Sequence, residues 1–421
     1  MMANLMIKKV LFALLLVCLV PACAKRITKP SIQAQPQNCN CPQVTQPIEV
    51  QAIQIPENNK PNEKPVDSTK IAEYSLLKQA KWEDIDGLIE DDLSAAWPAW
   101  LQSCTTLINK SQWQTVCSVA KTLTKPNSAA VIAYLTTYFD VFAASNQDGS
   151  NTGLVTGYFE PILKGSRTKS AQYQTPLYRQ PSDLVTVELA DIYPDLKYKR
   201  VRGKLVGNKL VPYSTRAEIE ANPSPQAGNE LVWINDIIDG FFLQIQGSGL
   251  VQLDSGEQVH VGYADQNGHT YNSIGRILID RGELMASQAS MQGIKTWAKN
   301  NPQKLRYLLN SNPSYVFFKE LPAGLPGPIG GLGVPIAAQR SVAVDPKFIP
   351  LGAPLFLSTT EPNSAKPLKR LMNAQDTGGA IKGGVRADFF WGAGNDAGAK
   401  AGAMKQQGKI WVFLPKGFKL N

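Results

Sequence analysis

NAQDTGGAIKGGVRADFFWGAG, residues 373–394, sets two aspartates and six glycines among short apolar runs. If LKRLMNAQ and VRADFF are neighbouring strands joined by a glycine loop, Asp376 and Asp388 converge at one end of a barrel, where the glycines let a ligand approach the backbone. The apolar neighbours of Asp388 predict a desolvated carboxyl with a raised pKa, able to donate a proton near neutral pH. In the alternative, which stays open, Asp376 caps a turn and Asp388 pairs with Arg386.

The chain on the N-terminal side of this segment is also predicted to be rich in β-strands, from Gly153 onward. Short alternating runs separated by Gly and Pro predict strands, including several within residues 229–265 and a hairpin at 251–261 around Asp254-Ser255-Gly256-Glu257. One amphipathic helix is predicted at about 291–309. Strands this short, jointed by glycine, favour β-barrels over alternating βαβ units.

Residues 71–144 are predicted to be helical, because apolar residues recur there at spacings of three and four. Pro98 and Pro126 divide the helical pattern. The four tryptophans of the region are expected in the core, and they are Trp82, Trp97, Trp100 and Trp113. Cys104 and Cys117 form either a disulfide or two buried thiols.

The first 22 residues are predicted to be a lipoprotein signal peptide, because a basic pair precedes an apolar run too short to span a bilayer. Val20-Pro21-Ala22-Cys23 resembles a lipobox, with Cys23 as the lipidation site; an ordinary cleaved signal is the alternative. Ala24 after the cysteine favours the outer membrane. Residues 23–70, rich in Pro and Gln, are predicted to be an extended tether.

Composition restricts the chemistry. The net charge is +9 and the isoelectric point about 9.1, but the Lys and Arg residues are scattered, which disfavours nucleic acid and fits an acidic polymer. There are two histidines, and no Cys/His group has metal-ligand spacing. An enzyme of this composition relies on carboxylates, and we expect neither metal nor cofactor.

Several longer motifs carry a family resemblance. Three segments around Asp345, Asp376 and Asp388 resemble a 3D domain: SVAVDPKFIPLGAPLFL (341–357), AQDTGGAIKG (374–383) and RADFFWGAG (386–394). Four upstream segments resemble the membrane-bound lytic murein transglycosylase A family: TGYFEP (156–161), FFLQIQGSG (241–249), VGYADQNGHTYNSIGR (261–276) and NPSYVFF (312–318). The resemblance extends from about Thr156 to Pro415.

The resemblance implies a mainly β fold with an N-terminal helical segment. A double-psi β-barrel domain would comprise residues 71–162 and 315–421, with the second part as the catalytic 3D domain. A second β-barrel domain, residues 163–314, would be inserted between them, leaving a groove for a glycan strand of peptidoglycan. Together with the lipobox and the tether, this predicts a protein attached by a lipid anchor to the periplasmic face of the outer membrane, and other cell-wall enzymes are a candidate class of partner.

The resemblance also implies the reaction. The family cleaves the β-1,4 bond between N-acetylmuramic acid and N-acetylglucosamine and leaves a 1,6-anhydromuramoyl end. Its essential acid corresponds to Asp388; one acid suffices because the substrate's C6 hydroxyl replaces the second carboxylate of ordinary glycosidases. Substrate-binding roles are expected for six further residues: Asp376, Gln246, Ser248, Lys382, Gly157 and Tyr158.

Two other functions remain as alternatives. A hydrolytic muramidase would use a second carboxylate, for which Asp376 qualifies, and would yield reducing ends. A non-catalytic peptidoglycan-binding lipoprotein would only tether the membrane to the wall, and it has no reason to bury a lone acid such as Asp388. Asp345, which precedes Pro346 in a predicted turn, is expected to be structural.

Overall fold

The computed structural model describes residues 72–420 of the 421-residue chain. The predicted signal peptide (1–22), the lipidation site Cys23 and the tether (23–70) lie outside the described residues. Within 72–420, no helix combines the length and the apolar character needed to cross a bilayer.

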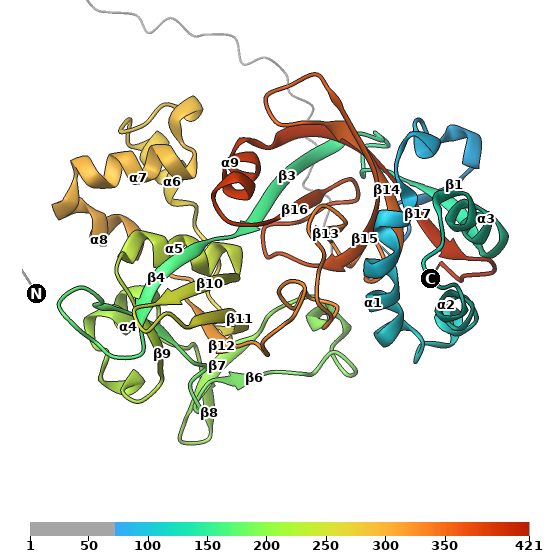
Figure 1. Cartoon of the computed structure of the whole chain (residues 1–421). Helices are drawn as coiled ribbons and strands as arrows, with labels where there is room; N and C mark the ends of the chain where they lie inside the picture. The colour runs from blue at the N-terminus through green and yellow to red at the C-terminus, as the bar shows by residue number, and fades with distance from the viewer. Residues whose placement is uncertain (1–71, 421) are drawn as a thin grey trace, which may run out of the picture. The chain divides into compact units, whose positions relative to one another are not determined.

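The first sheet has eight strands in the order β1-β2-β17-β14-β15-β13-β16-β3. Their bounds are β1 Leu77–Ala80, β2 Phe139–Ala144, β3 Gly153–Glu160, β13 Ser341–Val344, β14 Pro354–Thr360, β15 Pro367–Asp376, β16 Ala387–Ala393 and β17 Lys405–Pro415. An additional pairing of β17 with β3 closes six of these strands into a ring (Figure 1). Two pairings in the ring are parallel, β13 with β15 and β16 with β3, so the sheet is mixed.

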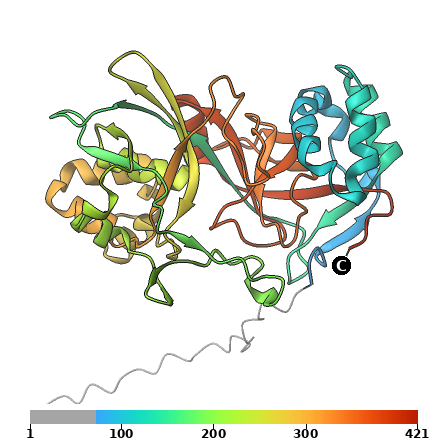
Figure 2. The same cartoon turned by 90° about the horizontal axis from the view of Figure 1, so that it is seen from below.

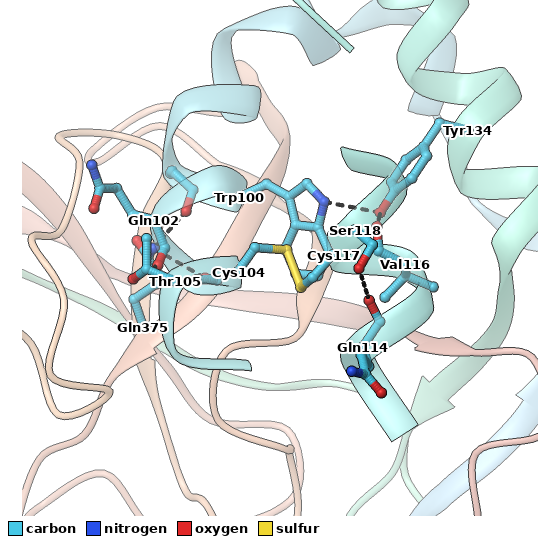
Figure 3. Close-up of a disulfide and its surroundings, with 12 residues drawn as sticks. Trp100, Gln102, Cys104, Thr105, Gln114, Val116, Cys117, Ser118, Tyr134 and Gln375 are labelled. Atoms are coloured by element: carbon cyan, nitrogen blue, oxygen red, sulfur yellow. Dashed lines mark hydrogen bonds between the residues drawn. A yellow bond between two sulfur atoms is a disulfide. The ribbon is translucent and has the colours of Figure 1, made fainter. Parts of the chain in front are cut away.

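Three helices pack beside this sheet, namely α1 Trp97–Leu107, α2 Ser111–Thr122 and α3 Ser128–Tyr138 (Figure 2). Trp97, Trp100 and Trp113 are buried among them, as predicted, and Trp82 packs against the same core. Cys104 of α1 and Cys117 of α2 form a disulfide (Figure 3), which decides between the two alternatives left by the sequence.

The prediction of helix throughout residues 71–144 was wrong at both ends, where β1 and β2 pair with each other. AAVIAYLTTYFDVFAA (129–144) is helical only to Tyr138. From Phe139 the backbone is extended, because β2 pairs antiparallel with β17, and this pairing buries Phe139 and Val141 in the core. A long-range pairing therefore overrides the local helical pattern.

The second sheet has six strands in the order β12-β11-β10-β4-β9-β5. They are β4 Ile162–Ser166, β5 Thr175–Tyr178, β9 Glu230–Ile234, β10 Ser248–Leu253, β11 Gln258–Gln266 and β12 Val316–Glu320. The predicted hairpin at 251–261 is confirmed as β10–β11. A single bridge between Arg179 and Phe318 brings the two edges of the sheet together.

Shorter elements complete the fold. A three-stranded sheet contains β6 Val185–Thr186, β7 Arg202–Val206 and β8 Lys209–Val211. The remaining α-helices are α4 Arg216–Ala221, α5 Ile237–Gln246, α6 Ile274–Asp280, α7 Met291–Asn300, α8 Pro302–Asn310 and α9 Asn395–Ala403. The 3-10 helices are η2 Trp82–Asp84, η3 Leu88–Glu90, η4 Leu93–Ala96, η5 Pro194–Leu196, η6 Ser224–Gln226 and η7 Ala286–Gln288.

Two predictions in the inserted region were wrong. Only strands were expected within residues 229–265, but residues 237–246 of that stretch form α5, because the Asp236 carboxylate caps the helix and Gly247 ends it in the left-handed conformation, with φ of 83°. The single helix expected at 291–309 is two helices. Pro302, which has no backbone N–H, begins the second one.

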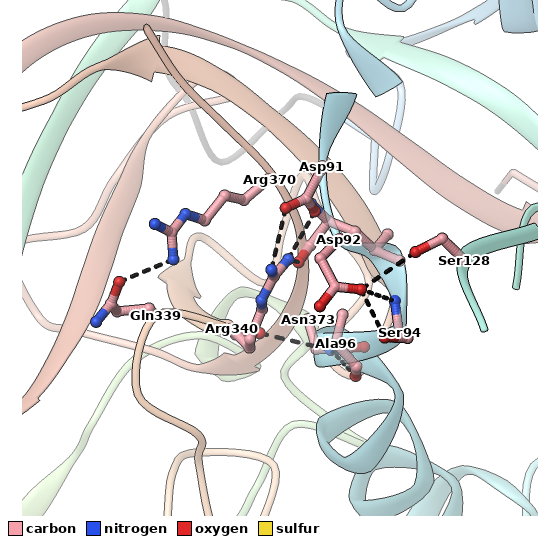
Figure 4. A network of polar contacts seen from close by, with 10 residues as sticks. Asp91, Asp92, Ser94, Ala96, Ser128, Gln339, Arg340, Arg370 and Asn373 are labelled. Atoms are coloured by element: carbon pink, nitrogen blue, oxygen red, sulfur yellow. Dashed lines mark hydrogen bonds and ion pairs between the residues drawn. The ribbon is translucent and has the colours of Figure 1, made fainter. Parts of the chain in front are cut away.

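A buried ion pair joins the segment before α1 to the first sheet (Figure 4). Both guanidinium Nη atoms of Arg340 donate to the Asp91 carboxylate, at 2.6 and 3.0 Å. The Leu371 backbone N–H of β15 donates to the same carboxylate at 2.8 Å. This bidentate pair fixes the position of β15, the strand that ends at Asp376.

Candidate active site

The two predicted aspartates converge, but not in the way expected. β15 and β16 are not neighbours, because β13 lies between them. Ala343 of β13 is the partner of Asp376 on one side and of Asp388 on the other. The two acids therefore lie at the same level of the sheet, one strand apart on each side of β13. Sequence alone does not show that β13 intervenes, since it comes from residues 341–344.

Asp388 lies in β16 opposite Thr156 of β3. The Thr156 hydroxyl donates to Asp388 Oδ1 at 2.5 Å and itself accepts a hydrogen bond from Arg386 Nη2 at 2.8 Å. No hydrogen bond from residues 72–420 reaches Asp388 Oδ2. Burial raises the pKa of Asp388 to about 6; the Thr156 hydrogen bond and the charge of Arg386 lower it in part, and the charge of Asp376 raises it. The predicted upward shift is confirmed.

The alternative of an Asp388–Arg386 ion pair is not realised, because the two charged groups do not approach within 4 Å and Thr156 mediates between them. Burial lowers the pKa of Arg386, and the charge of Asp388 opposes that effect. Arg386 therefore influences Asp388 across the hydroxyl of Thr156 without neutralising it.

Asp376 ends β15 and is held by three donors. Its Oδ2 accepts from the Tyr158 hydroxyl at 2.8 Å, and its Oδ1 accepts the backbone N–H groups of Gly331 and Thr377, both at 2.8 Å. Burial raises its pKa, and these three hydrogen bonds lower it. The contact with Thr377 is a local hydrogen bond at the end of β15, and within residues 72–420 no hydrogen bond joins Asp376 to the turn at 378–381, so the predicted turn cap is not found.

The neighbouring residue Gln375 explains why this strand end is well placed. Its side chain points toward α1, where Nε2 donates to Ala99 O at 2.7 Å and to Ser103 Oγ at 3.1 Å (Figure 3). Because side chains alternate along a strand, Gln375 faces the helices while Asp376 faces the opposite way. The disulfide-linked helix α1 thus helps to hold Asp376.

A cavity of about 500 Å³ opens beside Asp376 and is lined by residues of both large sheets. Asp376, Tyr158, Gln246 and Ser248 line it, so four of the predicted site residues share one cavity. Asp388 is not among its lining residues; it pairs with Thr156 of β3, and Tyr158, which does line the cavity, follows Thr156 by two positions.

A second cavity, of about 210 Å³, is lined by Gly157 and Gln246 among others. A side chain at Gly157 would place Cβ 2.7 Å from Trp391 Nε1 and 2.9 Å from Ala401 Cα. Glycine is therefore required here for close packing of β3 against β16 and α9. Gln246 Oε1 accepts the Phe159 backbone N–H at 3.0 Å, which fixes the end of α5 against β3.

Lys382 does not join the cavity. Its ammonium lies 4.0 Å from Asp345 Oδ1, and its side chain is 57% exposed. Asp345 is buried and accepts the backbone N–H groups of Lys347 and Gly383, at 3.3 and 3.0 Å, so it braces the glycine loop after Asp376, as its predicted structural role requires.

Sequence reasoning missed two groups at the site. Thr156, the hydroxyl donor to Asp388, lies beside Gly157 in TGYFEP, and the alternation of a strand gives a signal that Thr156 and Tyr158 face the same side. Arg200 and Tyr263 also line the large cavity. Tyr263 lies within the quoted motif at 261–276 but was not singled out, and nothing in the local sequence of Arg200 indicates a place at the cavity. Arg200 reaches the cavity through tertiary packing alone.

The arrangement suits proton transfer. A carboxyl group with a pKa of about 6 exists in both protonation states near neutral pH, so it can donate a proton and take one back. Asp376 supplies a second, hydrogen-bonded carboxyl nearby, at the wall of a cavity large enough for a sugar-sized ligand.

Two family models match the chain. Residues 154–319 match the MltA specific insert domain, and residues 340–414 match the 3D domain. The first match contains Thr156, Gln246 and Ser248, and the second contains Asp376 and Asp388.

Curated relatives carry a consistent name. Membrane-bound lytic murein transglycosylase A of Escherichia coli K12 is 34% identical over 285 residues, covering 65% of this chain and 70% of that protein. The Vibrio cholerae protein of the same name is 32% identical over 282 residues, covering 65% and 69%.

Solved structures agree. MltA of Neisseria gonorrhoeae is 36% identical with a TM-score of 0.71, covering 82% of this chain and 93% of that one. MltA of E. coli with bound chitohexaose is 26% identical with a TM-score of 0.60, covering 82% and 97%. With both family domains matched in order and relatives above 30% identity, this chain belongs to the membrane-bound lytic murein transglycosylase A family.

Proposed function

We propose that this chain is a lytic transglycosylase that cleaves the β-1,4 bond between N-acetylmuramic acid and N-acetylglucosamine in peptidoglycan, forming 1,6-anhydromuramoyl ends. The observation that carries the proposal is the Asp388 carboxyl, whose pKa burial raises to about 6, next to a cavity walled by Asp376. The names of the relatives and the chitohexaose bound to the E. coli protein support a glycan as the ligand.

In the proposed reaction, protonated Asp388 donates its proton to the glycosidic oxygen as the C1–O bond breaks. The muramoyl C6 hydroxyl then forms the new bond to C1, and the Asp388 carboxylate removes the C6 hydroxyl proton. Asp388 ends in its starting state, and no water is consumed. Oδ2, which has no hydrogen-bond donor within residues 72–420, is the oxygen available to the substrate, while Thr156 steadies Oδ1.

Asp376 is proposed to act beside it without changing protonation state. Its three hydrogen bonds favour the carboxylate, and a negative charge there stabilises the oxocarbenium-like transition state. Gln246, Ser248, Gly157 and Tyr158 are proposed to form the walls that hold the glycan. For Lys382 we keep the proposal of a contact with a muramoyl lactyl carboxylate; its exposed side chain is compatible with that role.

Architecture and location are proposed on the same grounds. The closed six-strand ring supports a double-psi β-barrel built from residues 71–162 and 315–421, with a second barrel, 163–314, inserted and a glycan groove between them. Lipidation at Cys23, the tether and attachment to the periplasmic face of the outer membrane are proposed from the leader sequence, and the relatives' membrane-bound name supports them.

Hydrolysis is the second candidate, because Asp376 and Asp388 flank the same residue, Ala343. In that reaction one carboxylate would activate water and the products would carry reducing ends. A purely binding lipoprotein is less well supported, since an unpaired buried acid gives a binder no advantage.

The test is mass spectrometry of muropeptides released from purified sacculi by the full chain in detergent. Anhydromuramoyl products that disappear in Asp388→Asn, but persist in the exposed hairpin-turn control Asp254→Asn, are the expected result. Reducing-end products that require both Asp388 and Asp376 would replace the proposal with hydrolysis. Bound but uncut sacculi would leave the binding lipoprotein.

A further inference from the structure

Two exposed cations line the same cavity as Asp376, and neither has a role in the reaction described above. Arg200 lies just before β7, and Lys319 lies in β12, opposite Gly262 of β11. Arg200 precedes β7 of the three-stranded sheet and Lys319 belongs to the second sheet, whereas Asp376 belongs to the first. The cavity therefore has an acidic wall and a basic wall.

Neither cation is neutralised by the protein. Within residues 72–420, no carboxylate lies within 4 Å of the Arg200 or Lys319 side chain. The Arg200 guanidinium lies 5.7 Å from the ring centroid of Tyr263, and its charge lowers the pKa of Asp376 only in part, against the effect of burial. Unpaired cations beside a cavity are free to meet an anionic ligand.

The nearby acids are already engaged. Both oxygens of Asp265 accept from Arg202 Nε at 2.9 Å, and the Thr186 hydroxyl donates to Oδ2 at 3.2 Å. Glu320, next to Lys319, receives both Nη atoms of Arg167, at 2.9 and 3.1 Å. These pairs leave Arg200 and Lys319 as the uncompensated charges at the cavity.

The segment that carries Arg200 is fixed at both ends. The Val187 backbone N–H donates to Val201 O at 3.1 Å, so the two ends of the 187–201 segment are hydrogen-bonded to each other. The next residue, Arg202, forms an ion pair with Asp265 of β11. Further out, the Lys197 ammonium pairs with Glu73 Oε1 at 2.5 Å. A cation held this way loses less freedom on binding a ligand than one on a loose loop.

We propose that Arg200 and Lys319 bind the carboxylates carried by muramoyl residues, and so select anionic murein strands over neutral N-acetylglucosamine polymers. The inference rests on the proposed function for the identity of the strand. Murein offers two sources of carboxylate: the lactyl group of peptide-free muramic acid, and the stem peptide where one is attached. Chitohexaose has the same type of backbone but no carboxylate, so the two cations have nothing to pair with.

The experiment measures binding by calorimetry in an Asp388→Asn background, so that strands are not cleaved. Three probes are compared at low salt: chitohexaose, peptide-free murein strands and peptide-bearing strands. Arg200→Gln and Lys319→Gln are each expected to weaken binding of carboxylate-bearing strands about twofold to fivefold, and the double variant about tenfold. Chitohexaose affinity stays unchanged, and so does every affinity in the control Lys299→Gln, an exposed lysine of α7 outside the cavity.

A loss on peptide-free strands alone assigns the lactyl carboxylate. A loss on peptide-bearing strands alone assigns the stem carboxylates, because the lactyl carboxyl is there bound in an amide. A loss on both murein probes means that the two cations accept a carboxylate from either source. Equal losses on chitohexaose, or no loss on either murein probe, would overturn the inference. Raising the salt to 0.5 M should shrink the preference of the parent protein for murein, because exposed charges are screened. Because binding is measured without turnover, a protein that fails to form anhydro ends refutes the proposed reaction and leaves carboxylate selection to be judged by the calorimetry alone.

Discussion

Asp91 packs against the first sheet and Asp388 lies within it, in β16, but the protein surrounds the two acids differently. Asp91 has a bidentate arginine and a backbone N–H, and its side chain is 6% exposed (Figure 4). Asp388 has one threonine hydroxyl, and its nearest arginine is turned to that hydroxyl. The difference teaches that an acid with a matched cation holds the fold, whereas an acid left unmatched can change its protonation state.

The largest expected effect separates the two acids by activity. Asp388→Asn should lower the rate of strand cleavage about 10²- to 10⁴-fold, because an amide cannot donate the proton. Asp91→Asn should leave the rate per folded molecule within about twofold. Initial release of soluble muropeptides, normalised to the folded fraction by circular dichroism, measures both. If Asp91→Asn cleaved slowly and Asp388→Asn cleaved at the parent rate, the catalytic role would belong to Asp91 and not to Asp388.

In unfolding free energy, Asp91→Asn should be the more damaging of the two substitutions. Asp91→Asn leaves the Arg340 guanidinium buried without its counter-charge and is expected to cost about 3–5 kcal/mol. Urea unfolding gives the value. The matched control is Asp86→Asn, since Asp86 pairs with Lys369 but its side chain is 74% exposed, and its loss should stay below about 1 kcal/mol. Similar losses in the two variants would mean that the buried pair contributes no more than a surface pair.

The disulfide sharpens the comparison, because it lies in the helices that hold Asp376 through Gln375. Replacing Cys104 and Cys117 by serine removes a cross-link between residues 13 apart and should cost about 3 kcal/mol of unfolding free energy. The pH dependence of cleavage should not change while the protein remains folded. A shifted pH profile in the folded variant would show that α1 tunes the acids as well as holding the fold.

A smaller effect concerns the stability cost of Asp388 itself. Its pKa is about 6 when folded and 3.8 as a free side chain, so the folded protein is penalised for its charge fully above pH 6 and not at all below about pH 3.8. Asp388→Asn should therefore raise the unfolding free energy by about 1–3 kcal/mol at pH 7. The gain should vanish by pH 3.5. Equal stability of the two proteins at pH 7 would argue against a raised pKa.

Local sequence was sufficient for some elements. The Asp254-Ser255-Gly256-Glu257 turn predicts its hairpin, and the apolar surroundings of Asp388 predict its raised pKa. Local sequence was insufficient where long-range contacts determine whether a segment is a strand and which strands are neighbours. β2 is a strand because β17 offers it an edge, and the two acids meet across β13, which comes from a distant segment.

For the site, the family motifs located Asp376, Tyr158, Gln246 and Ser248, which share one cavity. They did not locate Thr156 as the donor to Asp388, because hydrogen-bond partners depend on the parallel register of β3 and β16. Cations such as Arg200 reach the cavity from a segment without a motif of its own, so sequence pattern cannot indicate them.

The central claim is that Asp388 acts as the acid from a partly buried position without a paired cation. Its most direct test is the pH dependence of kcat/KM on soluble murein strands, for the parent protein and for Thr156→Val. We expect kcat/KM to fall tenfold per pH unit above about pH 6, and this limb to move to higher pH in Thr156→Val, because the lost hydrogen bond favoured the carboxylate. A profile that stays flat to pH 8, or a limb that does not move in Thr156→Val, would contradict it.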